Sequence, residues 1–228
     1  MPYAIAIDGP AGAGKSTIAR VLAKELHFIY VDTGALYRAL GYHMLQQGID
    51  PADESAVAPV LPALTVSLAY MQGEQRVLLN GEDISDRIRT PQVSMAASAI
   101  SAIPAVRTFL LQVQRDMAAT QSVVMDGRDI GTTILPQADV KIFLTASAQA
   151  RAARRHTELI QKGVDTTYEA VLEDMNKRDY DDIHRPVSPL RQAADAVLVD
   201  TSNDTLEEAI ARVRRVVTER LPAAGKET

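Results

Sequence analysis

The sequence predicts an α/β protein in which a five-stranded parallel sheet is flanked by helices. Two observations lead to this prediction. Short apolar runs such as Ser122–Asp126 and Val140–Leu144 lack polar alternation, which is typical of strands buried on both faces. Amphipathic helical patterns separate these runs, as they do in βαβ units. The length of 228 residues suits one domain, or one domain with an insertion.

The N-terminal part alternates strand and helix. The apolar run Tyr3–Asp8 is expected to be a strand that ends at a glycine-rich turn. Lys15–His27 is expected to be a helix, because its apolar residues recur at the spacing of one helical face. Those residues are Ile18, Val21, Leu22 and Leu26. A second strand, Phe28–Asp32, and a second helix, about Ala35–Gln47, follow.

One segment departs from this rhythm. Leu64–Asp83 alternates polar and apolar residues and contains Gly73 and the pair Asn80-Gly81. This pattern predicts a small antiparallel hairpin or three-stranded unit, inserted between helices of the main fold. Two helical patterns follow, Pro91–Ala102 and Pro104–Ala118, each with proline near its start.

The C-terminal part is expected to return to the sheet. A highly charged helical region spans Ala148–Asp182. Ala196–Val199 then has the apolar character of a buried strand. Leu206–Leu221 is expected to close the fold as a helix.

The composition favours a cytoplasmic protein that binds neither membranes nor nucleic acid. No apolar run reaches the ~18 residues of a membrane span, and the first ten residues carry no basic leader. The net charge of −5 opposes broad attraction to nucleic acid or anionic lipid. The absence of cysteine excludes disulfides and thiol metal sites, and the four histidines lack the spacing of metal ligands.

Residues Gly9–Ser16 match the pattern G-x-x-x-x-G-K-[ST] between the first strand and the first helix. Its glycines let backbone N–H groups face a phosphate, and the helix N-terminus adds partial positive charge. Lys15 is expected to reach the β- and γ-phosphates, and the Ser16 hydroxyl to ligate Mg²⁺. The sequence therefore predicts a P-loop. Its nucleotide-binding residues are Gly9, Pro10, Ala11, Gly12, Ala13, Gly14, Lys15, Ser16 and Thr17.

Three further clusters combine arginine with aspartate. Asp32–Arg38 and Asp126–Thr132 each follow a predicted strand, and Arg178–Arg185 lies in the late charged helix and loop. Ligands of α/β proteins bind at the carboxyl ends of the strands, and the planar guanidinium suits phosphate oxygens. Of the 24 basic residues, 18 are arginine. The clusters therefore indicate a second anionic ligand.

These motifs also resemble a known family. GPAGAGKST, DTGALYR, DGRDIGT and the R-D-x-x-D-x-x-R run look like those of the bacterial-type cytidylate kinases, in the nucleoside-monophosphate kinase group of P-loop kinases. The resemblance covers nearly the whole chain, from Ile5 to the last strand and helix. Members carry a small β insertion, to which Leu64–Asp83 is similar.

The resemblance implies an activity and a division of the chain. The protein would transfer the γ-phosphoryl group of ATP to CMP or dCMP, giving CDP or dCDP and ADP. Residues 1–34 and 119–228 would form the core with the P-loop, including a lid near 151–164. Residues 35–118 would form the monophosphate-binding region, with the β insertion at about 64–84.

The resemblance further implies an acceptor site. Arg38 would bind the CMP phosphate, and Asp129 would read the cytosine edge, where a carboxylate can accept from the N4 amino group. The implied CMP-binding residues are Thr33, Tyr37, Arg38, Ser98, Arg107, Arg128, Asp129, Arg178, Asp182 and Arg185. The implied catalytic residues are Lys15, Arg128, Arg178 and Arg154, the last from the lid run Arg151-Ala-Ala-Arg154-Arg155.

Mg²⁺ would accompany ATP, with Ser16 as its ligand and Asp126 as a candidate to hold it through water. The expected partners are the small molecules ATP and CMP or dCMP, and a monomer is the expected state. The residues alone leave two alternatives: a P-loop kinase for UMP, AMP or shikimate, or a switch protein that only binds ATP or GTP. The missing N-K-x-D guanine motif counts against the switch, and acceptor profiling separates the kinases.

Overall fold

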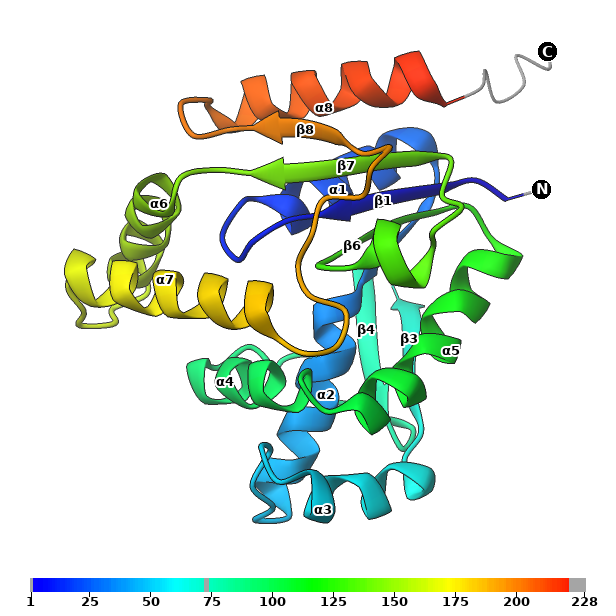
Figure 1. Cartoon of the computed structure of the whole chain (residues 1–228), viewed down its shortest axis with the longest axis vertical. Helices are drawn as coiled ribbons and strands as arrows, with labels where there is room; N and C mark the ends of the chain where they lie inside the picture. Colours follow the sequence, from blue (N-terminus) through cyan, green and yellow to red (C-terminus); the bar gives the residue numbers. More distant parts are fainter. Residues whose placement is uncertain (1, 72–73, 222–228) are drawn as a thin grey trace. The chain divides into compact units, whose positions relative to one another are not determined.

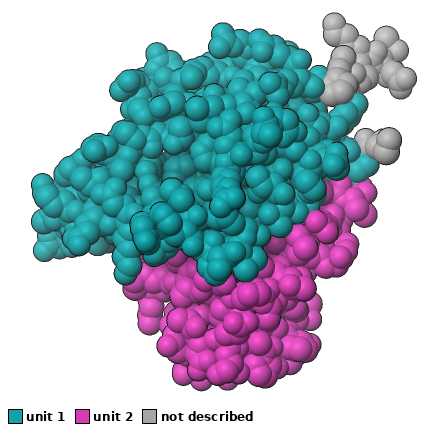
Figure 2. Space-filling view, in the orientation of Figure 1, with its two compact units in different colours: residues 1–30, 121–228 teal, residues 31–120 magenta. Residues whose placement is uncertain are grey.

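The computed structural model describes residues 2–71 and 74–221. It divides the chain into two compact units (Figure 2). Unit 1 comprises Met1–Tyr30 and Gln121–Thr228, and unit 2 comprises Val31–Thr120.

The predicted five-stranded parallel sheet is confirmed, with the strand order β2-β6-β1-β7-β8 (Figure 1). Its strands are β1 (Ala4–Asp8), β2 (Ile29–Asp32), β6 (Val123–Gly127), β7 (Val140–Thr145) and β8 (Val197–Asp200). The central strand β1 pairs Asp8 with Gly127 of β6 and with Phe143 of β7. The carboxyl ends of these three strands therefore meet at one edge, where α/β proteins bind ligands.

Helices cover the sheet of unit 1 because their apolar stripes need a partner surface. The helices that pack on the sheet are α1 (Lys15–Leu26) and α8 (Leu206–Arg220), whereas α6 (Ala148–Gln161) and α7 (Tyr168–His184) pack against each other. Ile18 and Leu22 of α1 and Val213 of α8 are buried in one cluster with residues of the sheet such as Ile5 and Ile142. This apolar layer holds α1, and with it the P-loop, against β1.

The highly charged region Ala148–Asp182 is helical, as predicted, and consists of two helices, α6 and α7. Gly163, with φ of 74°, follows the end of α6 in the left-handed conformation that glycine adopts at little cost. Thr167 then caps α7, since its Oγ1 accepts from the backbone N–H of Ala170 at 3.2 Å. A short π-helical turn, η2 (Ile130–Ile134), also follows β6.

Unit 2 contains the predicted antiparallel insertion as a three-stranded sheet, β3-β4-β5. Its elements are α2 (Thr33–Gln46), α3 (Glu54–Val57), the 3-10 helix η1 (Ala58–Ala63), β3 (Val66–Met71), β4 (Glu74–Leu79), β5 (Glu82–Asp83), α4 (Pro91–Ile100) and α5 (Pro104–Thr120). Asn80 and Gly81 both have positive φ, as the tight turn between β4 and β5 requires. Gly73, the other predicted turn residue, lies outside the described residues.

A close helix–helix contact organises unit 2. A Cβ on Gly41 of α2 would lie 2.9 Å from the backbone nitrogen of Ala97 of α4, so only glycine allows this approach. Among the described residues, no single helix is long and apolar enough to cross a membrane. Helices α4 and α5 pass that test only as a pair, which is bent by 101°.

Candidate active site

The backbone of the P-loop requires its glycines. Gly9, Gly12 and Gly14 have φ values of 149°, 74° and 89°, where other residues are strained. A Cβ on Gly9 would also lie 1.9 Å from the carbonyl oxygen of Leu144. Gly14 occupies the N-cap of α1 and has no side chain to bond the first helical N–H groups. This arrangement leaves a helix N-terminus suited to an anion.

Lys15 lies at the base of this loop with only 6% of its surface exposed. Its Nζ donates to the carbonyl oxygen of Pro10 at 2.7 Å. Burial, followed by the nearby charge of Arg128, lowers the pKa of Lys15 to about 7. An anion at the P-loop would offset both effects, because it favours the charged ammonium.

Ser16 and Asp126 provide oxygen atoms that suit Mg²⁺. The Ser16 hydroxyl donates to Oδ2 of Asp126 at 2.8 Å, joining α1 to β6. Mg²⁺ prefers oxygen ligands and is commonly held by one or two protein groups together with substrate phosphates. The described residues contain no group of three or more His, Asp or Glu that could hold a metal ion by themselves. The pair therefore fits a Mg²⁺ that arrives with a nucleotide.

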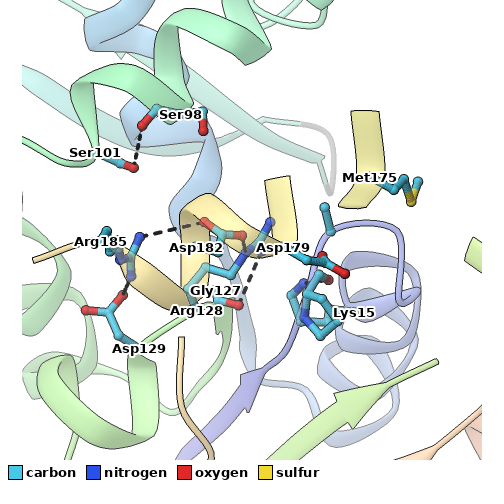
Figure 3. A network of polar contacts seen from close by, with 12 residues as sticks. Lys15, Ser98, Ser101, Gly127, Arg128, Asp129, Met175, Asp179, Asp182 and Arg185 are labelled. Carbon is cyan, nitrogen blue, oxygen red and sulfur yellow. Dashed lines mark hydrogen bonds and ion pairs between the residues drawn. The ribbon is translucent and has the colours of Figure 1, made fainter. Parts of the chain in front are cut away.

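A network of ion pairs links the turn after β6 to helix α7 (Figure 3). Nε of Arg128 donates to Oδ2 of Asp182 at 2.6 Å. Nη2 of Arg185 donates to Oδ1 of Asp129 at 3.3 Å, and both of these side chains are buried. The structure thus brings together four residues that the sequence assigned to the acceptor site. The two carboxylates thus pair with two guanidinium groups, of which that of Arg128 is close enough to Lys15 to act on its pKa.

Asp8 holds this turn from strand β1, a contact that sequence reasoning missed. Its two carboxylate oxygens accept from the backbone N–H groups of Ile130 and Gly131, each at 2.7 Å. Burial raises the pKa of Asp8 to about 6, although both N–H bonds oppose this shift. A charged residue at the end of an apolar strand run was the only signal in the sequence.

Arg151 of α6 connects the P-loop to α7, and its contacts were also not foreseen. Its Nη1 donates to the carbonyl oxygen of Ala11 at 2.9 Å and to Oδ1 of Asp179 at 3.0 Å, while Nη2 donates to the other Asp179 oxygen. Met175, one turn before Asp179, lies over Gly12, where an added Cβ would meet its terminal methyl group at 2.8 Å. One face of α7 therefore packs against the P-loop.

The other arginines of α6 and α7 lie elsewhere in unit 1. Arg154, the lid arginine chosen from the sequence, donates to the carbonyl oxygens of Thr201 and Asp204, between β8 and α8. Arg155 pairs with Glu158 on its own helix at 2.8 Å. Nε of Arg178 pairs with Asp174, one turn earlier in α7, at 3.0 Å. Arg178 therefore pairs within α7, one turn before Asp182, whereas Asp182 pairs with Arg128.

In unit 2, Asp32 organises the start of α2. Its Oδ1 accepts from the backbone N–H of Ala35 at 3.0 Å and so caps the helix, while Oδ2 accepts from Nη2 of Arg38 at 2.8 Å. Nε of Arg38 is buried and has no hydrogen-bond partner among the described residues. A buried guanidinium nitrogen in that state suits an anionic ligand.

The remaining predicted residues of unit 2 also lie around α2. The guanidinium of Arg107 stacks over the ring of Tyr37, with 5.7 Å between the Arg107 Cζ and the ring centre. Arg107 also donates to the carbonyl oxygen of Ser101. The Ser101 hydroxyl donates to the carbonyl oxygen of Ser98 (Figure 3). Thr33 is buried as the first residue of α2. Arg107 and Tyr37 thus place a buried cation in contact with an aromatic ring.

Comparisons with known proteins agree with these features. The sequence model of a family described as cytidylate kinase matches residues 5–219. A cytidylate kinase of Carboxydothermus hydrogenoformans is 49% identical over 213 residues, which cover 93% of this chain and 96% of that protein. A cytidylate kinase of Lactiplantibacillus plantarum is 49% identical over 216 residues, covering 95% of each chain.

A solved structure shows the same fold at low sequence identity. An uncharacterized protein from Eubacterium ventriosum is 13% identical, with a TM-score of 0.53 over 96% of this chain and all of that one. The match of the family model over nearly the whole sequence, with relatives at almost half identity, agrees with the P-loop and with the arginine and aspartate clusters. The chain belongs to the cytidylate kinase family.

Proposed function

We propose that this protein transfers the γ-phosphoryl group of ATP to CMP or dCMP, giving CDP or dCDP and ADP. Membership of the cytidylate kinase family supports the reaction. The observation that carries the proposal is the position of Lys15 in the P-loop beside Arg128 and its partner Asp182. A phosphate-binding loop with an added, fixed guanidinium suits transfer of a phosphoryl group.

The reaction needs no general base on the protein. CMP is a phosphate monoester, whose second pKa is about 6, so its attacking oxygen is already ionised at neutral pH. Catalysis then depends on aligning donor and acceptor and on stabilising charge on the transferring group. The protein must therefore supply fixed positive groups and must exclude water.

We assign the positive groups to Lys15, Arg128, Arg178 and Arg154. Lys15 would bind the β- and γ-phosphates, and Asp182 holds the Arg128 guanidinium in place. An arginine of this kind contributes ~10³-fold or more in rate in related phosphoryl transfers. Arg154 would have to leave the Thr201 and Asp204 carbonyl oxygens to reach phosphate, as a mobile lid residue does.

Mg²⁺ would be held by Ser16, with Asp126 acting through water, and would neutralise charge on the β- and γ-phosphates of ATP. The Ser16–Asp126 hydrogen bond keeps the hydroxyl oriented at the start of α1. The residues of the P-loop, Gly9 to Thr17, would bind the triphosphate through backbone N–H groups.

Recognition of cytosine is assigned to Asp129, Ser98 and Arg107. A carboxylate accepts a hydrogen bond from the N4 amino group of cytosine, whereas uracil presents a carbonyl oxygen at that position. Arg185 donates to Oδ1 of Asp129 and would hold that carboxylate in position. Arg38 would bind the acceptor phosphate with Thr33 and Tyr37 nearby. Asp182 and Arg185 would contact the sugar or phosphate.

We assign a separate role to each part of the chain under the same proposal. Residues 1–34 and 119–228 act as the core, with a lid near 151–164, and residues 35–118 bind the monophosphate. The enzyme acts as a cytoplasmic monomer without nucleic-acid or membrane partners, and the lack of cysteine fits a reducing compartment.

The test measures ADP release from Mg·ATP with CMP, dCMP, UMP, AMP or no acceptor. Strong stimulation by CMP and dCMP, with little by UMP, is expected. Equal rates with CMP and UMP would contradict the role of Asp129 in recognising cytosine, although the protein would still be a nucleoside-monophosphate kinase. If no monophosphate stimulates ADP release, the proposed reaction is wrong.

A further inference from the structure

Asp8 has a buried carboxylate. The proposed function gives it no role in binding ATP or CMP. Asp8 is the last residue of β1 and immediately precedes Gly9, the first residue of the P-loop. Only 4% of its surface is exposed. A carboxylate buried to this extent is costly unless hydrogen bonds or charges compensate it. Its contacts therefore indicate what it does.

Both carboxylate oxygens bond to the turn that follows β6. Oδ1 accepts from the N–H of Ile130 and Oδ2 from the N–H of Gly131, each at 2.7 Å. These residues begin η2, and the first N–H groups of a helical turn have no partner within it. Asp8 thus caps this turn from a neighbouring strand, 122 residues earlier in the sequence.

Gly131 lies close to the Asp8 carboxylate, with little room for a side chain. A Cβ at this position would lie 3.3 Å from Oδ2 of Asp8 and 3.1 Å from the side-chain Cδ of Lys141. A larger residue would therefore push against both side chains. The hydrogen bond from Gly131 to Asp8 therefore depends on both residues.

The residues just before the capped turn are Arg128 and Asp129. Arg128 pairs with Asp182, and Asp129 pairs with Arg185 (Figure 3). These ion pairs fix the ends of the two side chains, but the backbone between β6 and η2 needs its own support. Asp8 supplies that support directly from the strand that starts the P-loop.

We propose that Asp8 is a positioning residue for phosphoryl transfer, whose carboxylate holds the Arg128–Asp129 turn in register with the P-loop. This inference rests on the proposed function, which gives Arg128 the transferring phosphates and Asp129 the base. The charge of Asp129 raises the pKa of Asp8 and that of Lys15 lowers it, and Arg128 also interacts electrostatically with Asp8. The ammonium of Lys15 favours the ionised carboxylate that the two N–H groups require.

The test compares wild type with Asp8→Asn. Asparagine has one acceptor oxygen, and its amide N–H₂ would face one of the two backbone N–H groups. Misplacing a reacting group by about 1 Å can cost ~10²-fold in rate, so a fall in kcat of ~10- to 100-fold is expected. The KM for ATP should change by less than ~3-fold, because the P-loop itself is intact. The preference in kcat/KM for CMP over UMP should also fall.

Asp139→Asn is the matched control. Asp139 accepts from the backbone N–H of Ala4 at 2.8 Å, at the opposite end of the same strand, and is exposed. Its activity should stay within ~2-fold of wild type, since surface substitutions of this kind have small effects. Gly131→Ala perturbs the Asp8 contact from the other side and should lower kcat in the same direction as Asp8→Asn.

NMR of the ligand-free wild-type protein tests the hydrogen bonds of Asp8 directly, so this test does not require that any variant folds. The amides of Ile130 and Gly131 should exchange slowly with solvent and resonate downfield, as N–H groups bonded to a carboxylate do. Rapid exchange of both amides would overturn the proposal. So would a folded Asp8→Asn protein with wild-type kcat and base preference. Absence of CMP-stimulated activity in wild type would instead remove the proposed function, a separate outcome.

Discussion

The Ser16 hydroxyl donates to Oδ2 of Asp126 at 2.8 Å, so the first turn of α1 is joined to strand β6. The two residues are 110 positions apart in the sequence and meet because β6 pairs directly with β1. Asp126 pairs with Ile7 in that register, one residue before Asp8 and two before the P-loop. The Mg²⁺ ligands proposed above are thus held by the register of two adjacent strands.

Replacing Asp126 with asparagine should weaken the response to Mg²⁺. Loss of one carboxylate that orients a metal ligand typically costs ~10-fold or more in metal affinity. The half-saturating Mg²⁺ concentration for ADP formation at fixed ATP should therefore rise by ~10-fold. Asp116→Asn on the surface of α5 is the control. An unchanged Mg²⁺ titration in the Asp126 variant would contradict the assignment.

ATP binding should be coupled to proton uptake by Lys15. Its pKa of about 7 in the ligand-free protein leaves the side chain mostly neutral at pH 8. Triphosphate oxygens favour the charged form, so binding at pH 8 should take up about one proton, and binding at pH 6 much less. Calorimetry in two buffers with different ionisation enthalpies measures this difference. Lys15→Arg should abolish it, because arginine stays charged at both pH values. Equal uptake at pH 6 and pH 8 would rule out the lowered pKa.

Asp129→Asn should relax the choice of base. The asparagine amide can offer an oxygen to the N4 amino group of cytosine or an N–H to the O4 of uracil. Its oxygen can still accept from Arg185, so the ion-pair network loses only charge. The ratio of kcat/KM for CMP over UMP should fall by ~10-fold, in the range of one base-reading contact. Asp181→Asn, at an exposed neighbouring position in α7, should keep the wild-type ratio. If the folded Asp129 variant kept the wild-type preference for CMP over UMP, other residues would have to recognise the base.

Gly9→Ala should destabilise unit 1 more than its backbone angle alone explains. The added Cβ would lie 1.9 Å from the Leu144 carbonyl oxygen, and φ is 149°. Gly48→Ala is the control, because φ is 67° there and the space around it is open. The control should lose ~1 kcal/mol of unfolding free energy from the left-handed backbone, whereas Gly9→Ala should lose more than ~3 kcal/mol. Denaturant unfolding measures both. Equal losses of unfolding free energy in the two variants would show that the backbone around Gly9 and Leu144 can shift to accept the added Cβ.

Local patterns predicted most of the secondary structure. The P-loop was predictable because its glycines, Lys15 and Ser16 act on one phosphate within a single turn of chain. The sheet strands were predictable because burial on both faces leaves an apolar run. The division of Ala148–Asp182 into α6 and α7 was not predicted from the sequence. The region is charged throughout, so its composition does not mark the interruption at Gly163 or the helix start at the Thr167 cap.

Contacts that cross the sheet lay beyond sequence reasoning. Asp8 had no marked feature except its place before the P-loop, and its partners are Ile130 and Gly131. Arg151 and Arg154 occupy one basic run, yet one reaches Ala11 and the other the β8–α8 loop. Spacing on a helix gives the direction of each side chain but not the element it meets.

The sequence by itself determined the family, the P-loop and the residue types that suit phosphate and cytosine. These depend on short motifs, whose chemistry is carried by neighbouring residues. Only the tertiary structure decided which carboxylate holds which cation, because the order β6-β1-β7 brings the strand ends together. Hydrogen bonds act over about 3 Å, so partners more than a hundred residues apart are chosen by the register of the sheet and not by the local pattern.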